Sequence, residues 1–275
     1  AFLCGDDAIT QSVIDKSLPR LQIISKYGIG LDKINVDYAT KKGLPVLFTP
    51  GVNHTTVAEH TFGLLLGITK DIQSNAVAVQ NGEWVAGWKK PVGNEIMGKT
   101  IGILGLGRIG KEVAIRARAF GMSIIAFDPY FDDSFASENG VKRCANMDEV
   151  LHNSDVVSLH CFLNDETEDM INAAKIAEMR DQVIVLNCAR GELVNTKDMA
   201  DALKSGKVGG YGADVLDAEP PAPGHVLIGA PNCIITSHIG SRTHESVQRQ
   251  ANRCLNNAIN FFSGAEDVLC ANGVL

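Results

Sequence analysis

The chain has 275 residues, 45% of them hydrophobic and 21% charged, which is typical of a folded globular protein with a sizeable core. Its formal net charge of -7 argues against a nucleic-acid-binding protein, which normally presents a basic face. The sequence contains no run of about eighteen apolar residues, so no membrane span is predicted.

Short β-branched runs alternate with helical patterns along most of the chain. We predict strands at residues 1–4, 21–24, 46–48, 100–104, 123–127, 156–160, 183–187, 211–215 and 233–236. Helices are predicted at residues 11–16, 56–80, 109–120, 147–152, 173–179, 197–204 and 243–262. Such alternation is typical of parallel sheets with helices on both faces, so we expect an α/β fold.

Two boundaries divide this pattern, one at the start of the long helix after Asn53 and one near Gly240. We expect residues 53–240 to form a complete Rossmann-type domain. Residues 1–52 and 241–275 would together form a second, discontinuous domain. The chain opens inside a predicted strand and lacks an initiator Met, so we expect the natural chain to begin earlier.

The most informative segment is a glycine-rich turn between the strand at 100–104 and the following helix. It contains Gly105, Gly107 and Gly110 in the GxGxxG pattern, with Arg108 and Ile109 between the second and third glycines. The first glycine suits a tight turn, the second leaves room for a pyrophosphate, and the third allows close helix–strand packing. The helix N-terminus then offers free N–H groups to the phosphates, so a dinucleotide site is predicted.

Asp128 ends the next strand, about twenty residues beyond these glycines. A carboxylate at this position can bind the adenosine ribose hydroxyls and would repel a 2′-phosphate, which favours NAD over NADP. The alternative is that Asp128 only begins a turn with Pro129.

Three ionisable residues follow successive predicted strands: Arg190, Glu219 and His238. The carboxyl ends of parallel strands meet at one edge, where ligands bind. A histidine can exchange a proton near neutral pH, a neighbouring carboxylate favours its charged form, and an arginine can grip a carboxylate through two hydrogen bonds. Each residue also has a structural interpretation: a capping Arg, a surface Glu before Pro220, or a buried core His.

The sequence resembles the D-isomer-specific 2-hydroxyacid dehydrogenase family, in the branch that includes D-3-phosphoglycerate dehydrogenase. The resemblance rests on KYGIGLDKINV, NHTTVAEHTFGLLLG, GKTIGILGLGRIGKEVA, VIVLNCARGELVN, GADVLDAEPP and ITSHIGS, which span nearly the whole chain. It implies two domains with Rossmann- or flavodoxin-like parallel sheets, one binding NAD and the discontinuous one binding substrate. It also implies hydride transfer at C2 of a small D-2-hydroxy or 2-oxo acid, with Arg190, Glu219 and His238 as the catalytic set.

Further roles are implied by this resemblance alone. Arg108 and Ile109 would lie along the pyrophosphate. The path from adenine to nicotinamide would be lined by Cys161, Cys188 and Ala189. Asp214 would hold the nicotinamide carboxamide, and the segment from His238 through Gly240 to Ser241 would close the site.

In the discontinuous domain, the resemblance implies that the backbone of Gly28, Ile29 and Gly30 receives the substrate carboxylate. For Lys26, a substrate contact and a solvated strand-end lysine remain equally open. The family usually begins with two further strand–helix units, so this domain is expected to be incomplete at its N-terminus. Asp6 and Asp7 are acidic where a phosphorylated substrate would favour a basic residue, so we expect an unphosphorylated acid to be preferred.

Two other functions remain open, because fold alone does not determine function. One is an NAD-sensing corepressor-like interaction protein, and the other is a phosphite-type oxyanion dehydrogenase. In the family, a segment such as residues 81–96, with Trp84 and Trp88, forms an arm that wraps a partner, so a homodimer is expected. Seven scattered cysteines without CxxC spacing predict reduced thiols in a cytoplasmic protein and no metal site.

Overall fold

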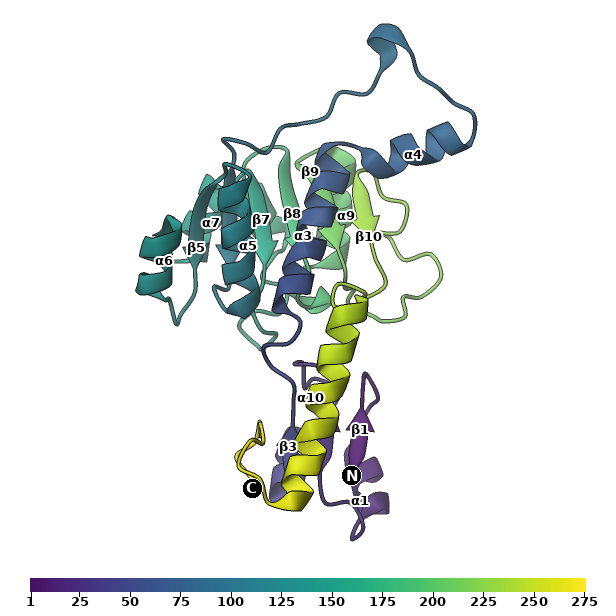
Figure 1. Cartoon of the computed structure of the whole chain (residues 1–275). Coiled ribbons are helices and arrows are strands. Elements are labelled where there is room, and N and C mark those ends of the chain that lie inside the picture. The colour runs from purple at the N-terminus through teal and green to yellow at the C-terminus, as the bar shows by residue number, and fades with distance from the viewer. The chain divides into compact units, whose positions relative to one another are not determined.

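The computed structural model describes residues 1–275 except for the side chain of Trp88. The chain divides into two compact units, residues 1–53 with 241–275 and residues 54–240. Each unit contains one sheet whose neighbouring strands pair in parallel, with helices packed around it (Figure 1). The expected α/β fold with two parallel sheets is therefore confirmed.

The smaller unit is built on a three-stranded sheet in the order β1-β2-β3. Its strands are β1 (Phe2–Cys4), β2 (Ile24–Lys26) and β3 (Val46–Leu47), and its helices are α1 (Gln11–Ser17), α2 (Val36–Lys41) and α10 (His244–Ser263). Helix α10 comes from the far end of the sequence but joins this sheet, because Ser25 Oγ donates to the Cys254 carbonyl at 2.8 Å. This hydrogen bond between β2 and α10 links residues 1–53 to residues 241–275.

The larger unit contains a seven-stranded sheet in the order β10-β9-β8-β7-β4-β5-β6. Its strands are β4 (Thr100–Leu104), β5 (Ser123–Phe127), β6 (Val141–Arg143), β7 (Val156–Leu159), β8 (Val183–Asn187), β9 (Val208–Ala213) and β10 (Cys233–Ile235). Its helices are α3 (His54–Thr69), α4 (Ile72–Gln80), η1 (Gly87–Lys89), α5 (Arg108–Ala119), α6 (Asp133–Asn139), α7 (Met147–Asn153), α8 (Ala173–Glu178), η2 (Gly191–Leu193) and α9 (Thr196–Ser205). None of the described helices is both long and apolar enough to cross a membrane.

The central strands are buried on both faces, as their continuous apolar sequences predict. Ile101 and Ile103 on β4 are fully buried and pair with residues of β7 next to them. Helix α5 turns Val113, Ala114 and Ala117 into the same core. The small side chains on α5 let the helix lie close to β4, and the glycine turn leads directly into its N-terminus, with Gly107 as the N-cap.

The predicted helix over residues 56–80 is wrong as a single helix, because the structure has α3 and α4 with a break at Asp71. Asp71 adopts a left-handed conformation with φ of 50°. Asn94 N donates to the Thr69 carbonyl at 2.7 Å, and this hydrogen bond comes from a segment distant in sequence. The periodicity of residues 56–80 contains no signal for the left-handed Asp71 or for this tertiary contact at the end of α3.

Candidate active site

The predicted site residues of the larger unit lie at the carboxyl edge of its sheet, as parallel strands require. Gly105 follows β4, Asp128 follows β5, Cys161 follows β7, Arg190 follows β8, Asp214 follows β9 and His238 follows β10. Residues separated by more than 130 positions in sequence are thus gathered at one edge of one sheet.

The glycine turn has the shape expected of a phosphate-binding loop. Gly105 has φ of 95°, and a Cβ there would lie 2.6 Å from the His160 carbonyl carbon. A Cβ on Gly110 would lie 2.1 Å from the Gly105 oxygen, so the helix packs as closely as a glycine permits. Gly107 has open space where a side chain would be and is the N-cap of α5, without a capping side chain. This free space beside unused helix N–H groups fits a pyrophosphate.

Asp128 is bound to this turn through both of its carboxylate oxygens. Oδ2 accepts the Leu106 N–H at 2.6 Å, and Oδ1 accepts the Tyr130 N–H at 2.7 Å. The bond to Tyr130 closes a turn around Pro129, so Asp128 shapes that turn, as the alternative interpretation of this residue expects. The first bond places the carboxylate against the glycine turn, where ribose hydroxyls could still donate to its remaining lone pairs.

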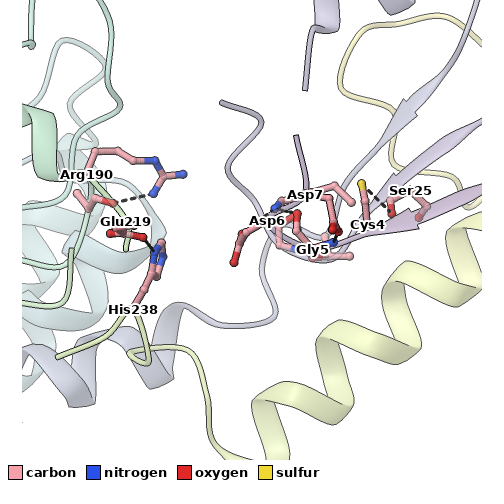
Figure 2. Close-up of polar contacts among 12 residues, drawn as sticks. Cys4, Gly5, Asp6, Asp7, Ser25, Arg190, Glu219 and His238 are labelled. Atoms are coloured by element: carbon pink, nitrogen blue, oxygen red, sulfur yellow. Dashed lines mark hydrogen bonds and ion pairs between the residues drawn. The ribbon is translucent and has the colours of Figure 1, made fainter. Parts of the chain in front are cut away.

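His238 and Glu219 form a direct pair. His238 Nδ1 lies 2.7 Å from Glu219 Oε2, and Glu219 Oε1 accepts the Leu216 N–H at 3.1 Å (Figure 2). An ionised carboxylate can only accept hydrogen bonds, so Nδ1 must carry a proton. The second ring nitrogen, Nε2, is then the one that can give or take a proton from another molecule.

The environment of this pair favours its charged form. The hydrogen bond that His238 donates to Glu219 is the largest influence on the pKa of His238 and raises it, against the opposing effect of burial. For Glu219, burial acts to raise the pKa, but the hydrogen bond and the charge of His238 outweigh it and lower the pKa. By contrast, burial lowers the pKa of His160 to about 3. Of these two histidines, only His238 is therefore suited to proton transfer near neutral pH.

Arg190 lies beside this pair at the end of β8 (Figure 2). Its Nη1 donates to the Ala189 carbonyl at 2.7 Å, and its positive charge acts to lower the pKa of His238. Asn187, which we did not predict, holds the turn that carries it. The Asn187 side chain accepts the Ala189 N–H at 3.0 Å and donates to the Arg190 carbonyl at 2.8 Å. The Asn in VLNCARG is the sequence signal for this turn, since Asn side chains commonly bond to backbone nearby.

Asp214, the residue expected to hold the nicotinamide carboxamide, accepts several hydrogen bonds from the chain itself. It is 3% exposed, and its carboxylate accepts the N–H groups of Ile239 and Gly240 at 2.9 and 2.7 Å. Thr236 Oγ1 also donates to it at 2.6 Å and lies 2.8 Å from His60 Nε2. The Asp214 carboxylate thus anchors the turn after β10.

This turn holds the catalytic candidate in an unusual conformation. His238 has φ of 54°, in the left-handed region that non-glycine residues rarely adopt, and its N–H donates to the Asp214 carbonyl at 2.9 Å. Burial acts to raise the pKa of Asp214, but its hydrogen bonds from His60, Thr236 and the backbone outweigh it and lower the pKa. Thr236 and His60 were not predicted. The threonine two residues before the histidine, in ITSH, was the available signal.

The two cysteines expected along the cofactor path are free, partly buried thiols. Burial raises the pKa of Cys161 to about 11 and that of Cys188 to about 12. The Cys161 thiol contacts the Met170 sulfur at 3.6 Å. Both residues are partly buried beside Ala189, consistent with an apolar wall and with no role as nucleophiles.

In the smaller unit, Lys26 is not a solvated strand-end lysine. Its side chain is buried, with the residue 4% exposed, and it donates to the Gly5 carbonyl and to Asp6 Oδ1, the latter at 3.1 Å. Asp6 is therefore partly neutralised, while Asp7 accepts the Gly5 N–H at 3.1 Å (Figure 2). The pairing with Lys26 reduces the repulsion that Asp6 could exert on a substrate phosphate. The preference for an unphosphorylated substrate stays a prediction.

The loop after β2 contains the backbone groups expected to receive a carboxylate. Gly28 has φ of 128°, and a Cβ there would lie 3.4 Å from Lys26 Cε. Its N–H donates to Thr49 Oγ1 at 2.9 Å, so Ile29 and Gly30 would have to supply the donors. Ser241, at the other end of this unit's sequence, accepts a bond from Gln250 Nε2 at 3.4 Å ahead of α10.

The chain is similar in sequence to several known enzymes. The chain is 39% identical over 238 residues to D-3-phosphoglycerate dehydrogenase of Methanocaldococcus jannaschii, covering 86% of this chain and 45% of that protein. It is 36% identical over 260 residues to glyoxylate reductase of Korarchaeum cryptofilum, covering 94% and 78%. The chain thus spans about half the length of the phosphoglycerate dehydrogenases it matches, 45% and 48% for two of them.

The structure also resembles solved enzymes. D-lactate dehydrogenase from Aquifex aeolicus, solved with NAD and lactic acid, matches with a TM-score of 0.89 and 31% identity, covering 99% of this chain and 87% of that one. The family model for the D-isomer specific 2-hydroxyacid dehydrogenase NAD binding domain matches residues 62–240. This chain therefore belongs to the D-isomer specific 2-hydroxyacid dehydrogenase family, and residues 62–240 are its NAD-binding domain.

Proposed function

We propose that this chain catalyses the NAD-dependent interconversion of a small D-2-hydroxy acid and the corresponding 2-oxo acid. The observation that carries the proposal is the 2.7 Å bond between Glu219 Oε2 and His238 Nδ1, at the sheet edge that also presents Arg190 and the glycine turn. An acid–base pair, a cation and a dinucleotide-binding turn at one edge are what this reaction requires.

The residues for holding NAD are those of the glycine turn and the strand ends beside it. Gly105, Gly107 and the N-terminus of α5 would hold the pyrophosphate, with Arg108 and Ile109 along it. Asp128 would bind the adenosine ribose, and Cys161, Cys188 and Ala189 would line the path to the nicotinamide. When bound, NAD supplies or accepts the hydride at C2 of the substrate.

His238 is the proposed general acid and general base. In reduction, the protonated ring gives the Nε2 proton to the oxygen on C2, and in oxidation the neutral ring takes it back. Glu219 holds the proton on Nδ1 and stabilises the imidazolium. Arg190 would bind the substrate carboxylate and polarise the carbonyl through paired hydrogen bonds. In the smaller unit, the Ile29 and Gly30 backbone is our candidate for a further carboxylate contact.

Asp214 is better explained as the anchor of the turn that carries His238 than as a first ligand of the nicotinamide. Both of its oxygens already accept hydrogen bonds from the chain. A carboxamide could use only a remaining lone pair. Gly240, whose Cβ would lie 2.7 Å from Asp214 Oδ2, must be glycine for this anchoring.

The function is tested by NADH oxidation with glyoxylate, hydroxypyruvate, pyruvate and phosphohydroxypyruvate. We expect turnover of at least one of them, and loss of that turnover in Arg190→Gln, which removes the cation while keeping a polar side chain. A preference for an unphosphorylated acid would support the electrostatic effect of Asp6 and Asp7. If none of the four is reduced and NADH still binds, the proposed activity is wrong and an NAD-sensing role becomes the better explanation.

Cofactor preference should depend on the charge of Asp128. We expect wild type to prefer NADH over NADPH in kcat/KM, and Asp128→Asn to narrow that preference about tenfold or more. Two unit charges about 4 Å apart repel by roughly 1–4 kcal/mol between bulk water and a protein surface. The Asn variant removes this charge while keeping an acceptor for the Leu106 N–H. Asp128→Ala, which also loses that bond, should weaken binding of both cofactors, and equal use of NADH and NADPH by wild type would contradict the ribose assignment.

A homodimer is the expected assembly. None of the residues of α4 is buried within this chain, although Ile72, Val77 and Val79 on it are apolar. The segment after it exposes Trp84, which is 77% exposed; the side chain of Trp88 lies outside the described residues. Apolar exposure of this extent is typical of an interface.

Light scattering at micromolar concentration should give twice the chain mass, and a Val77→Ser/Val79→Ser double variant should shift the mass toward the monomer. A wild-type mass of one chain would refute this prediction.

A further inference from the structure

Gly191, the residue after Arg190, packs its backbone directly against a peptide bond of another loop. A Cβ at Gly191 would lie 1.9 Å from the Leu216 carbonyl carbon, 2.2 Å from its oxygen and 2.3 Å from Asp217 N. Carbon atoms in normal contact are about 3.5–4.0 Å apart. Any side chain at this position would therefore displace one loop from the other by more than an ångström.

The two loops in contact carry two of the three catalytic candidates, Arg190 and Glu219, while His238 lies on the turn after β10. On one side, Gly191 follows Arg190, whose carbonyl accepts Asn187 Nδ2 at 2.8 Å and is thereby fixed to the end of β8. On the other side, the Leu216 N–H donates to Glu219 Oε1 at 3.1 Å. The peptide that touches Gly191 thus belongs to the same short loop that orients the Glu219 carboxylate toward His238.

The Leu216–Asp217 peptide is held from its other neighbours as well, so it cannot simply yield. The Leu216 side chain is buried in the core of the larger unit. The Asp217 carboxylate lies 2.9 Å from His225 Nε2. A side chain at residue 191 would have to move either the Arg190 turn or the Glu219 loop, both of which are otherwise anchored.

We infer that Gly191 is a positioning residue that sets the separation between Arg190 and the Glu219–His238 pair. The inference rests on the proposed function, because it assigns Gly191 a role in that same site. Displacing catalytic groups by about 1 Å commonly costs about 10²-fold in rate. Because Gly191 acts through the Glu219 loop, its replacement should also alter the proton affinity of His238.

The test compares Gly191→Ala with Gly209→Ala in the full chain. Gly209 is a matched control, since its Cβ would lie 2.5 Å from the Gln182 carbonyl oxygen, a clash with backbone at the amino ends of β8 and β9. We expect Gly191→Ala to lower kcat about 10²-fold, with NADH binding by fluorescence retained. An NMR titration of the His238 ring should show a lower pKa than in wild type. Gly209→Ala should leave kcat and the His238 pKa unchanged, even if its melting temperature falls.

A second pair of variants tests the role of Gly191 if Gly191→Ala does not fold. Leu216→Ala loosens the same peptide from its other side without a backbone clash, and Leu203→Ala removes an equal side chain from the same core. Leu216→Ala should lower the His238 pKa, and Leu203→Ala should not. If the His238 pKa is the same in each variant and its control, the inference is overturned. Because the NMR titration needs no turnover, that result is distinct from a failure of the proposed activity, which the substrate panel reports.

Discussion

Replacing His238 by Ala should lower kcat by roughly 10²–10⁴-fold, the usual effect of removing a general acid or base. The pH dependence that His238 gives to kcat/KM should vanish in the same variant. The reason is that Nδ1 is bonded to Glu219 at 2.7 Å, so Nε2 is the ring nitrogen left to exchange a proton with substrate in the proposed reaction. Measuring kcat and kcat/KM from pH 5 to 10 with the best 2-oxo acid checks both expectations.

The backbone of His238 requires a second variant. Its φ of 54° is in the left-handed region, where Ala is disfavoured but Asn is tolerated. His238→Asn should therefore keep the turn that Asp214 anchors while removing the titrating ring, and should lose rate as the Ala variant does. His152→Ala, which alters a surface histidine, is the control and should keep wild-type kinetics. If His238→Asn retains more than about a tenth of wild-type kcat, another group supplies the proton.

Local patterns predicted the elements that bury continuous apolar surface. Strands β4 and β8 have the predicted bounds, because their β-branched runs suit a strand buried on both faces. The edge strand β6 and helix α6 were missed, since β6 has three residues, two of which are exposed. Short, solvent-facing elements carry too little hydrophobic periodicity to be distinguished from loops.

The features of the site that depend only on residue type and position at strand ends could be predicted from the sequence. A histidine, a carboxylate and an arginine at strand ends suggested an acid–base pair, and the structure brings Glu219 and His238 into hydrogen-bond contact. The competing contacts could not be foreseen. Asp214 is occupied by backbone N–H groups of residues 239 and 240, and the closeness of Gly191 to the Leu216–Asp217 peptide depends on two loops meeting in space. Sequence alone identifies which groups are present but not which partners they already have.

Glu219→Gln should shift the pH profiles of both reaction directions to lower pH. It should also lower the kcat for reduction of the 2-oxo acid near pH 7 by roughly 10- to 100-fold. The hydrogen bond from His238 to the Glu219 carboxylate is the main cause of the raised pKa of His238, so removing the charge should lower that pKa. A hydrogen bond to a charged group is worth about 1.5–3 kcal/mol, which corresponds to this range of rates. The Gln side chain can still accept the Leu216 N–H, so the loop should keep its conformation.

The sign of the shift follows from which form of the ring is active. Reduction needs the imidazolium and is lost as pH rises through the pKa of His238, so its high-pH limb should move to lower pH in Glu219→Gln. Oxidation needs the neutral ring and is lost as pH falls through that pKa, so its low-pH limb should also move to lower pH. Oxidation should then persist in more acid solution than in wild type, relative to its own maximum.

The matched control for this prediction is Glu178→Gln, which makes the same substitution in a carboxylate 3.8 Å from the surface His152. Its kcat/KM profile should superimpose on that of wild type in both directions. An NMR titration of the His238 ring adds a direct measurement and should show the lower pKa in Glu219→Gln alone. If the limbs of Glu219→Gln stay at their wild-type positions while kcat falls, Glu219 orients the ring without setting its proton affinity.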